Sequence, residues 1–136
     1  EWDEPKAREL EQQGLDGFLE AWYRQPLFHS IRRNQARFAS LIERRRQNNI
    51  AGLALSLRLM GTGSQEPLWN QVPGIRVPWL AVVGELDVHY RKIMQDMVSV
   101  SRKGRLATIS DAGHNTHFEN PTAFSRALRE FLVSCG

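Results

Sequence analysis

The chain has 136 residues, enough for one hydrophobic core, and its 41% apolar and 24% charged residues are typical of a globular protein rather than a disordered one. The net charge of +3 is only a mild excess, which argues against a nucleic-acid partner. The sequence has no stretch near the roughly 20 apolar residues of a membrane span, and its single cysteine, Cys135, excludes an internal disulfide and a cysteine-based metal cluster.

The first part of the chain, residues 1–74, is predicted to be helical. Residues 4–13 are rich in strong helix formers, and Gly14 should break that helix. Apolar side chains then recur at helical spacing up to Trp22. Three further helices are expected: a short one over residues 26–31, one that carries Phe38, Leu41 and Ile42 and ends near residues 48–49, and one over residues 50–60 that is ended by Gly61 and Gly63.

The second part, residues 75–136, alternates strand and helix. Strands are predicted over residues 78–83 and 105–109, and helices over residues 88–100 and 121–133. This order implies two parallel strands joined by a right-handed crossover, the pattern of an α/β fold. Two parallel strands do not make a stable sheet alone, so we expect the sheet to continue in residues outside this chain.

Titratable side chains follow both predicted strands. Asp87 comes three residues after Gly84, and His114 comes three residues after Asp111. Because ligands gather at the carboxyl ends of strands in open α/β sheets, we expect Asp87 and His114 to form a catalytic pair. In such a pair the carboxylate holds the imidazole in one tautomer so that it acts as a general base.

Simpler interpretations exist for each residue. An Asp that precedes a helix is commonly its N-cap, and a lone loop histidine is commonly structural. In α/β hydrolases the chain order is Ser, then Asp or Glu, then His, but no G-x-S-x-G pattern for the nucleophile occurs here. The segment nearest to that pattern contains Ser64, which is predicted to be a loop or cap residue.

Two other clusters of polar side chains are candidates for a binding site. His114, His117 and Glu119 lack the helical spacing of a zinc site, so no metal is expected. The arginines at 44–46 fit a solvated helix face, or alternatively a pocket for an anionic ligand.

Several motifs together resemble 2-succinyl-6-hydroxy-2,4-cyclohexadiene-1-carboxylate synthase, a menaquinone and phylloquinone pathway enzyme of the α/β-hydrolase fold. The segment GHNTHFENP at residues 113–121 is similar to the family's catalytic-histidine segment, and FLEAWYRQPLF at residues 18–28 is similar to its cap-helix signature. Arg45 with the asparagines at 48–49, MGTGSQ at 60–65 and GELD at 84–87 follow in the family's order.

The resemblance implies the fold, the site and the reaction. The chain would be the C-terminal part of an α/β-hydrolase fold, with a helical cap at residues 1–74 and the last β-α-β-α part of the core at residues 75–136. Asp87 and His114 would be the triad acid and base, while Trp22 and Arg45 would contact the substrate. The family eliminates pyruvate from a small anionic substrate, 2-succinyl-5-enolpyruvyl-6-hydroxy-3-cyclohexene-1-carboxylate, with no metal or organic cofactor.

The family's serine and oxyanion-hole segment lie upstream of the matched motifs. We therefore expect this chain to be inactive by itself and to need the N-terminal part of the same enzyme as its partner, in the cytoplasm or in a plastid. The alternatives are another α/β hydrolase that cleaves an ester or a C–C bond, or a non-catalytic remnant that serves as an interaction module.

Overall fold

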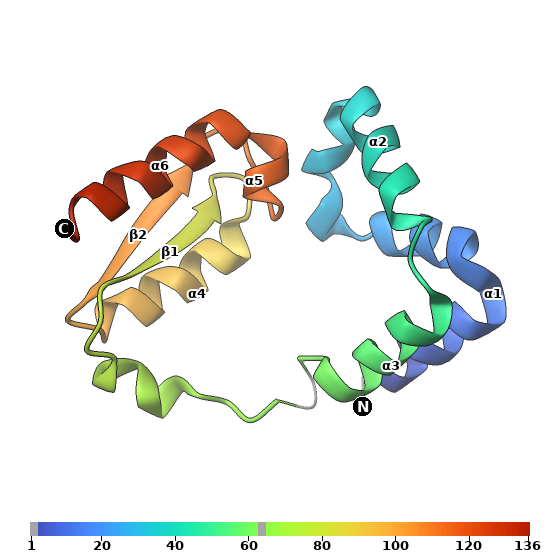
Figure 1. Ribbon diagram of the computed structural model, residues 1–136, viewed down its shortest axis with the longest axis horizontal. Coiled ribbons are helices and arrows are strands. Elements are labelled where there is room, and N and C mark those ends of the chain that lie inside the picture. The colour runs from blue at the N-terminus through green and yellow to red at the C-terminus, as the bar shows by residue number, and fades with distance from the viewer. Residues whose placement is uncertain (1–2, 63–64) are drawn as a thin grey trace. The chain divides into compact units, whose positions relative to one another are not determined.

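The computed structural model describes residues 3–62 and 65–136, and the chain divides into two compact units (Figure 1). The first unit comprises Glu1–Pro26 and Arg33–Pro67. The second comprises Leu27–Arg32 and Leu68–Gly136. Ser64 and Gly63, for which the sequence predicts a loop or cap and a helix end, lie outside the described residues.

The first unit is built from three helices, α1 (Asp3–Tyr23), α2 (Gln35–Arg45) and α3 (Ile50–Met60). The predicted break at Gly14 is confirmed, because its φ of 72° and ψ of 176° interrupt α1 with a kink that glycine adopts readily. Helix α3 packs along α1 (Figure 1). Their core consists of four buried side chains, Ala7, Leu10, Phe18 and Ala54.

Asparagines define the ends of the helices in this unit. The side chain of Asn34 accepts from the N–H of Arg37 at 3.0 Å at the start of α2, and Asn49 accepts from the N–H of Gly52 at 2.8 Å at the start of α3. The predicted end of α2 near residues 48–49 is too late. The helix ends at Arg45, whose carbonyl accepts from both the backbone and the side chain of Asn48.

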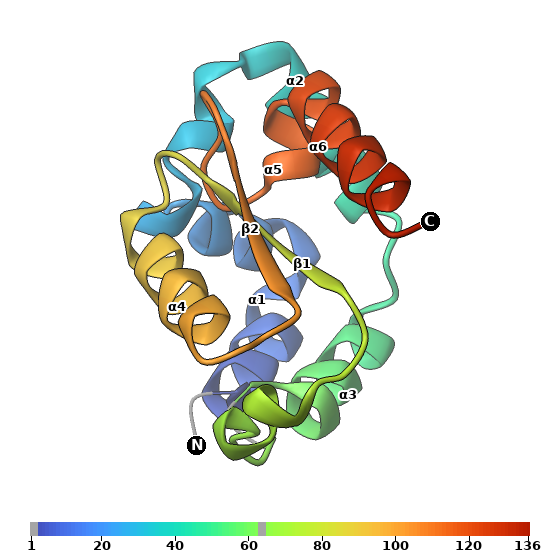
Figure 2. The ribbon, with the colours of Figure 1, turned by 90° about the vertical axis from the view of Figure 1, so that its left-hand side faces the viewer.

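The second unit contains two parallel strands, β1 (Trp79–Gly84) and β2 (Gly104–Ile109), paired in register from Trp79 with Gly104 to Gly84 with Ile109. The predicted parallel pairing is therefore confirmed. Helices α4 (Val88–Ser99) and α6 (Pro121–Val133) cover opposite faces of the pair (Figures 1 and 2). Ala81, Val83 and Ile109 are buried between these layers.

Four short elements differ from the prediction. The single helix expected over residues 26–31 is wrong, because two 3₁₀ turns, Pro26–Phe28 and Ser30–Arg33, stand there instead. The 3₁₀ turn Trp69–Gly74 and the one-turn helix α5 (Thr116–Glu119) are not among the predicted elements. One turn is too short for an apolar period to emerge.

Among the described residues, no helix is both long enough and apolar enough to cross a membrane.

Candidate active site

The loops that leave β1 and β2 are joined by hydrogen bonds. The N–H of Glu85 donates to Ile109 O at 2.9 Å, and the N–H of Leu86 donates to Ala112 O at 2.9 Å. The Glu85 carboxylate accepts from the N–H of Asp111 at 3.1 Å. Asp111 itself has a φ of 53°, a left-handed conformation that Asp tolerates better than most residues. The two strand ends therefore hold each other in a fixed arrangement.

This arrangement brings Asp87 and His114 into contact. Nδ1 of His114 lies 2.8 Å from Oδ2 of Asp87, whose side chain is only 5% exposed, whereas that of His114 is 33% exposed. An ionised carboxylate only accepts hydrogen bonds, so the contact places the imidazole proton on Nδ1 and leaves Nε2 free to accept. This is the state that a histidine base requires.

Asp87 is also the N-cap of α4. Its second oxygen, Oδ1, accepts from the N–H of Tyr90 at 3.1 Å. The capping interpretation and the catalytic interpretation of this residue are therefore compatible, since each uses a different carboxylate oxygen. The cap fixes the carboxylate plane, and that plane in turn orients the imidazole.

Two aromatic rings flank the His114 imidazole. The Tyr90 ring lies at a centroid distance of 4.7 Å and the Phe28 ring at 6.0 Å, with its plane nearly perpendicular at 77°. These contacts restrict rotation of the imidazole. Sequence analysis singled out neither ring, although Tyr90 stands three residues after Asp87 and so could have been placed near the base.

The cluster of His114, His117 and Glu119 serves other contacts. The His117 ring lies 5.9 Å from the Phe124 ring, and both Glu119 carboxylate oxygens accept backbone N–H groups. Within the parts of the chain that the structure describes, no three His, Cys, Asp or Glu side chains are grouped to hold a metal ion.

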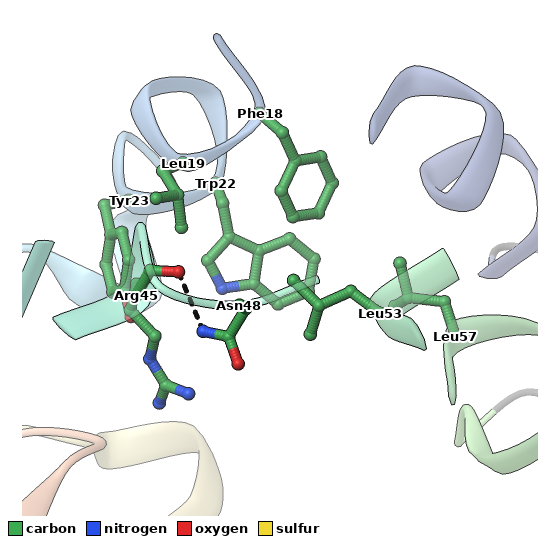
Figure 3. Close-up of a pocket in the computed structure, with 8 residues that line it drawn as sticks. All are labelled: Phe18, Leu19, Trp22, Tyr23, Arg45, Asn48, Leu53 and Leu57. Atoms are coloured by element: carbon green, nitrogen blue, oxygen red, sulfur yellow. Dashed lines mark hydrogen bonds between the residues drawn. The ribbon is translucent and has the colours of Figure 1, made fainter. Parts of the chain in front are cut away.

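A separate pocket of about 220 Å³ lies within the first unit (Figure 3). Its walls combine an apolar side with polar groups, and the lining residues are Phe18, Leu19, Trp22, Tyr23, Arg45, Asn48, Leu53 and Leu57. The Trp22 indole stacks on the Phe18 ring at a centroid distance of 5.5 Å. Trp22 and Arg45, the two residues expected to contact substrate, thus line one pocket.

Arg45 differs from its charged neighbours. Arg46 pairs with Asp16 at 2.6 Å and with Glu43 at 3.4 Å, and the Asp16 carboxylate raises the pKa of the Arg46 guanidinium. The Arg45 guanidinium forms no ion pair with any residue in the ranges 3–62 and 65–136. The pocket therefore presents a positive charge that no described residue pairs with, beside an aromatic and aliphatic wall, a combination suited to an anionic ligand with an apolar ring.

Known proteins resemble this chain in sequence and in fold. No protein-family model matches it. Over 123 residues it is 40% identical to a Bacillus subtilis (strain 168) protein provisionally named 2-succinyl-6-hydroxy-2,4-cyclohexadiene-1-carboxylate synthase, a match that covers 89% of this chain and 44% of that protein. The structure of MenH from S. aureus matches with a TM-score of 0.93 at 28% identity, over 97% of this chain and 50% of that one.

The chain is homologous to the C-terminal half of the MenH synthases. Its predicted fold, the C-terminal part of an α/β hydrolase, is confirmed by the same matches. The chain is also 32% identical over 140 residues to Protein PHYLLO, chloroplastic, of Arabidopsis thaliana. This match covers 96% of this chain and 8% of that protein. The chain spans about half the length of the bacterial MenH relatives it matches.

Proposed function

We propose that the whole protein to which this chain belongs eliminates pyruvate from 2-succinyl-5-enolpyruvyl-6-hydroxy-3-cyclohexene-1-carboxylate in menaquinone or phylloquinone biosynthesis. The observation that carries the proposal is the 2.8 Å contact between Asp87 and His114 at the ends of β1 and β2. Homology to the MenH synthases supports the choice of this reaction among those that an Asp–His pair can serve.

In this proposal His114 is the general base and Asp87 orients it. Nε2 of His114 accepts the proton of a serine that the N-terminal part of the enzyme supplies. The activated serine removes a proton from the substrate ring, and the C–H electron pair forms a ring double bond. The ring double bond already present shifts by one position as the C–O bond to the enolpyruvyl group breaks. The His114 imidazolium, which holds the serine proton, then protonates the leaving enolate to pyruvate, so atoms and charge balance.

The cap pocket supplies the proposed binding residues. Arg45 pairs with a carboxylate of the substrate, because a guanidinium forms two parallel hydrogen bonds with that group. Trp22 packs against an apolar face of the substrate, supported by its stacking on Phe18. Residues 1–74 would act as the cap that excludes water from the reaction, and residues 75–136 as the C-terminal part of the core.

The proposed partner and compartment follow from the same reasoning. The partner is the N-terminal part of the same enzyme, which carries the serine. A cytoplasmic enzyme is proposed, or a plastid one in a plant, an alternative supported by the likeness to chloroplastic PHYLLO.

The test is pyruvate release by the purified whole protein. We expect one pyruvate per enolpyruvyl substrate consumed, measured by its enzyme-coupled reduction to lactate. The kcat of His114→Gln should fall by about 10²- to 10⁴-fold. Turnover of simple aryl esters without pyruvate release would favour a hydrolase instead. If the protein shows no turnover and is not labelled by a serine-directed fluorophosphonate, it is a non-catalytic remnant and the proposal is overturned.

Arg45→Gln tests the substrate class. Loss of a charge-assisted hydrogen bond of about 1.5–3 kcal/mol should raise KM for the anionic substrate by about 10- to 100-fold. Arg44→Gln on the same helix is the matched control, since Arg44 does not line the pocket. Equal KM values for the two variants would remove Arg45 from the binding site.

A further inference from the structure

The Glu119 side chain bonds to the backbone on both sides of His114. Its Oε2 accepts from the N–H of Gly113 at 3.0 Å, and its Oε1 accepts from the N–H of Asn115 at 3.0 Å. A single carboxylate thus bridges the two residues that flank the base. Hydrogen bonds to a charged acceptor are about twice as strong as neutral ones.

This bridge restrains the conformation of the histidine backbone. The N–H of Gly113 belongs to the peptide plane before Gly113, and the N–H of Asn115 belongs to the plane after His114. Only four soft dihedrals, φ and ψ of Gly113 and of His114, lie between these two anchored planes. Fixing them fixes the position and direction from which the His114 side chain leaves the backbone.

Helix α5 ties Glu119 back to the same loop. The N–H of Glu119 donates to Asn115 O at 2.9 Å, so both the main chain and the side chain of Glu119 bond to Asn115. The carboxylate resembles that of a capping box, in which an acidic side chain of the first turn reaches back to the N-cap N–H. The Asn115 side chain makes no capping bond of its own. Its Oδ1 is buried without a hydrogen-bond partner among the described residues, and the side chain that bonds to the Asn115 N–H is that of Glu119.

The loop has little room to adopt another position. A Cβ on Gly113 would lie 2.0 Å from Oγ of Ser30 and 3.4 Å from Oε1 of Glu119. A side chain at position 113 would therefore require Ser30, in the 3₁₀ turn Ser30–Arg33, to shift.

We propose that Glu119 is a positioning residue that sets the His114 imidazole against Asp87 by clamping the backbone on either side of the base. Its catalytic consequence rests on the function proposed above, in which His114 is the base. Both Glu119 oxygens accept backbone N–H groups of this loop, so its proposed action is on the loop.

The experiment compares Glu119→Gln with Glu119→Asp in the whole protein. Gln keeps one acceptor oxygen but turns an NH₂ group toward the other N–H, so one bond is replaced by two opposed donors. Asp keeps two oxygens on a chain that is one methylene shorter. Because small misplacements of a catalytic group cost up to about 100-fold, we expect kcat to fall about 10- to 100-fold for Gln and less for Asp, with KM unchanged.

A second measurement does not need turnover. In protein with ¹⁵N-labelled histidine, the downfield resonance of the Nδ1 proton shared by His114 and Asp87 should move upfield or broaden in Glu119→Gln. Glu130→Gln, an exposed glutamate on α6, is the charge-matched control and should leave both kcat and this resonance unchanged.

The outcomes separate this inference from the proposed function. If Glu119→Gln only lowers the Tm and leaves kcat and the Nδ1 resonance at their original values, Glu119 is merely structural and the inference is overturned. If the unaltered protein releases no pyruvate, the function fails, yet the Nδ1 resonance still decides whether Glu119 positions His114.

Discussion

Asp87 makes two contacts, one with each of its carboxylate oxygens. Oδ1 caps α4 through the N–H of Tyr90, while Oδ2 bonds to Nδ1 of His114. A substitution can remove the contact with His114 and keep the cap. That separation allows the catalytic contribution to be measured apart from the structural one.

Asp87→Asn should retain the helix cap but no longer hold the His114 imidazole in the tautomer that a base requires. Asparagine caps helices as well as aspartate does, but its NH₂ group would face Nδ1 and favour the tautomer with the proton on Nε2. That tautomer cannot accept a serine proton, so we expect kcat for pyruvate release to fall about 10³- to 10⁴-fold, with little change in the free energy of unfolding.

Asp87→Ala is the comparison for this prediction. Its kcat should fall as far as that of Asp87→Asn. Because the helix cap is also lost, its free energy of unfolding, measured with urea, should fall by about 1 kcal/mol. If Asp87→Asn kept kcat within tenfold of the original, Asp87 would not orient the base.

At the scale of elements, the site depends on how closely the ends of β1 and β2 approach each other. A Cβ on Gly84 would lie 2.1 Å from Gly113 O and 2.3 Å from Ala112 O, both of them backbone atoms that cannot swing aside. The last residue of β1 therefore lies directly against the loop that carries His114. Any side chain there would push that loop away from Asp87.

Gly84→Ala should consequently reduce both stability and activity. Overpacking of this kind costs about 1–3 kcal/mol, measured by urea unfolding, and kcat should fall together with it. Gly74→Ala is the matched control in the same unit, because a Cβ there meets no atom within 4 Å. Its stability should stay within about 0.5 kcal/mol of the original. Equal effects of the two substitutions would contradict the close approach described here.

The regular elements could be predicted from the sequence because their signals are local. The apolar run of β1, the proline at the start of α6 and the glycine after α3 place those boundaries within a residue or two. Helix α5 and the 3₁₀ turns could not be predicted, since a single turn carries no periodicity.

The site was only partly predictable at the scale of the whole molecule. Parallel strands place Asp87 and His114 at one edge, so their proximity follows from topology. The bridge from Glu119 to the flanking N–H groups depends on the backbone path of the loop, which side-chain patterns do not encode. The pocket around Trp22 likewise needs Leu53 and Leu57 of α3 beside α1, a packing that only the folded unit defines.

Ion pairs between α1 and α3 give the molecule a predicted acid sensitivity. The Arg58 guanidinium donates from Nε to Glu4 at 2.7 Å and from Nη1 to Glu11 at 2.8 Å. Hydrogen bonding to Arg58 lowers the pKa of both carboxyl groups below their ordinary value of 4.5. The same pairs raise the pKa of Arg58, which therefore stays charged over the acid range.

The sign of the pH dependence follows from these directions. A carboxyl group with a lowered pKa in the folded state stabilises that state fully above its unfolded pKa, here 4.5, and loses this contribution as the pH falls through the folded value. We therefore expect the Tm of the whole protein to fall more steeply below pH 4.5 than that of Arg58→Gln, which lacks the pairs. Because these side chains are exposed, added salt should weaken the difference. Parallel Tm curves for the two proteins below that pH would show that Arg58 does not hold α1 and α3 together.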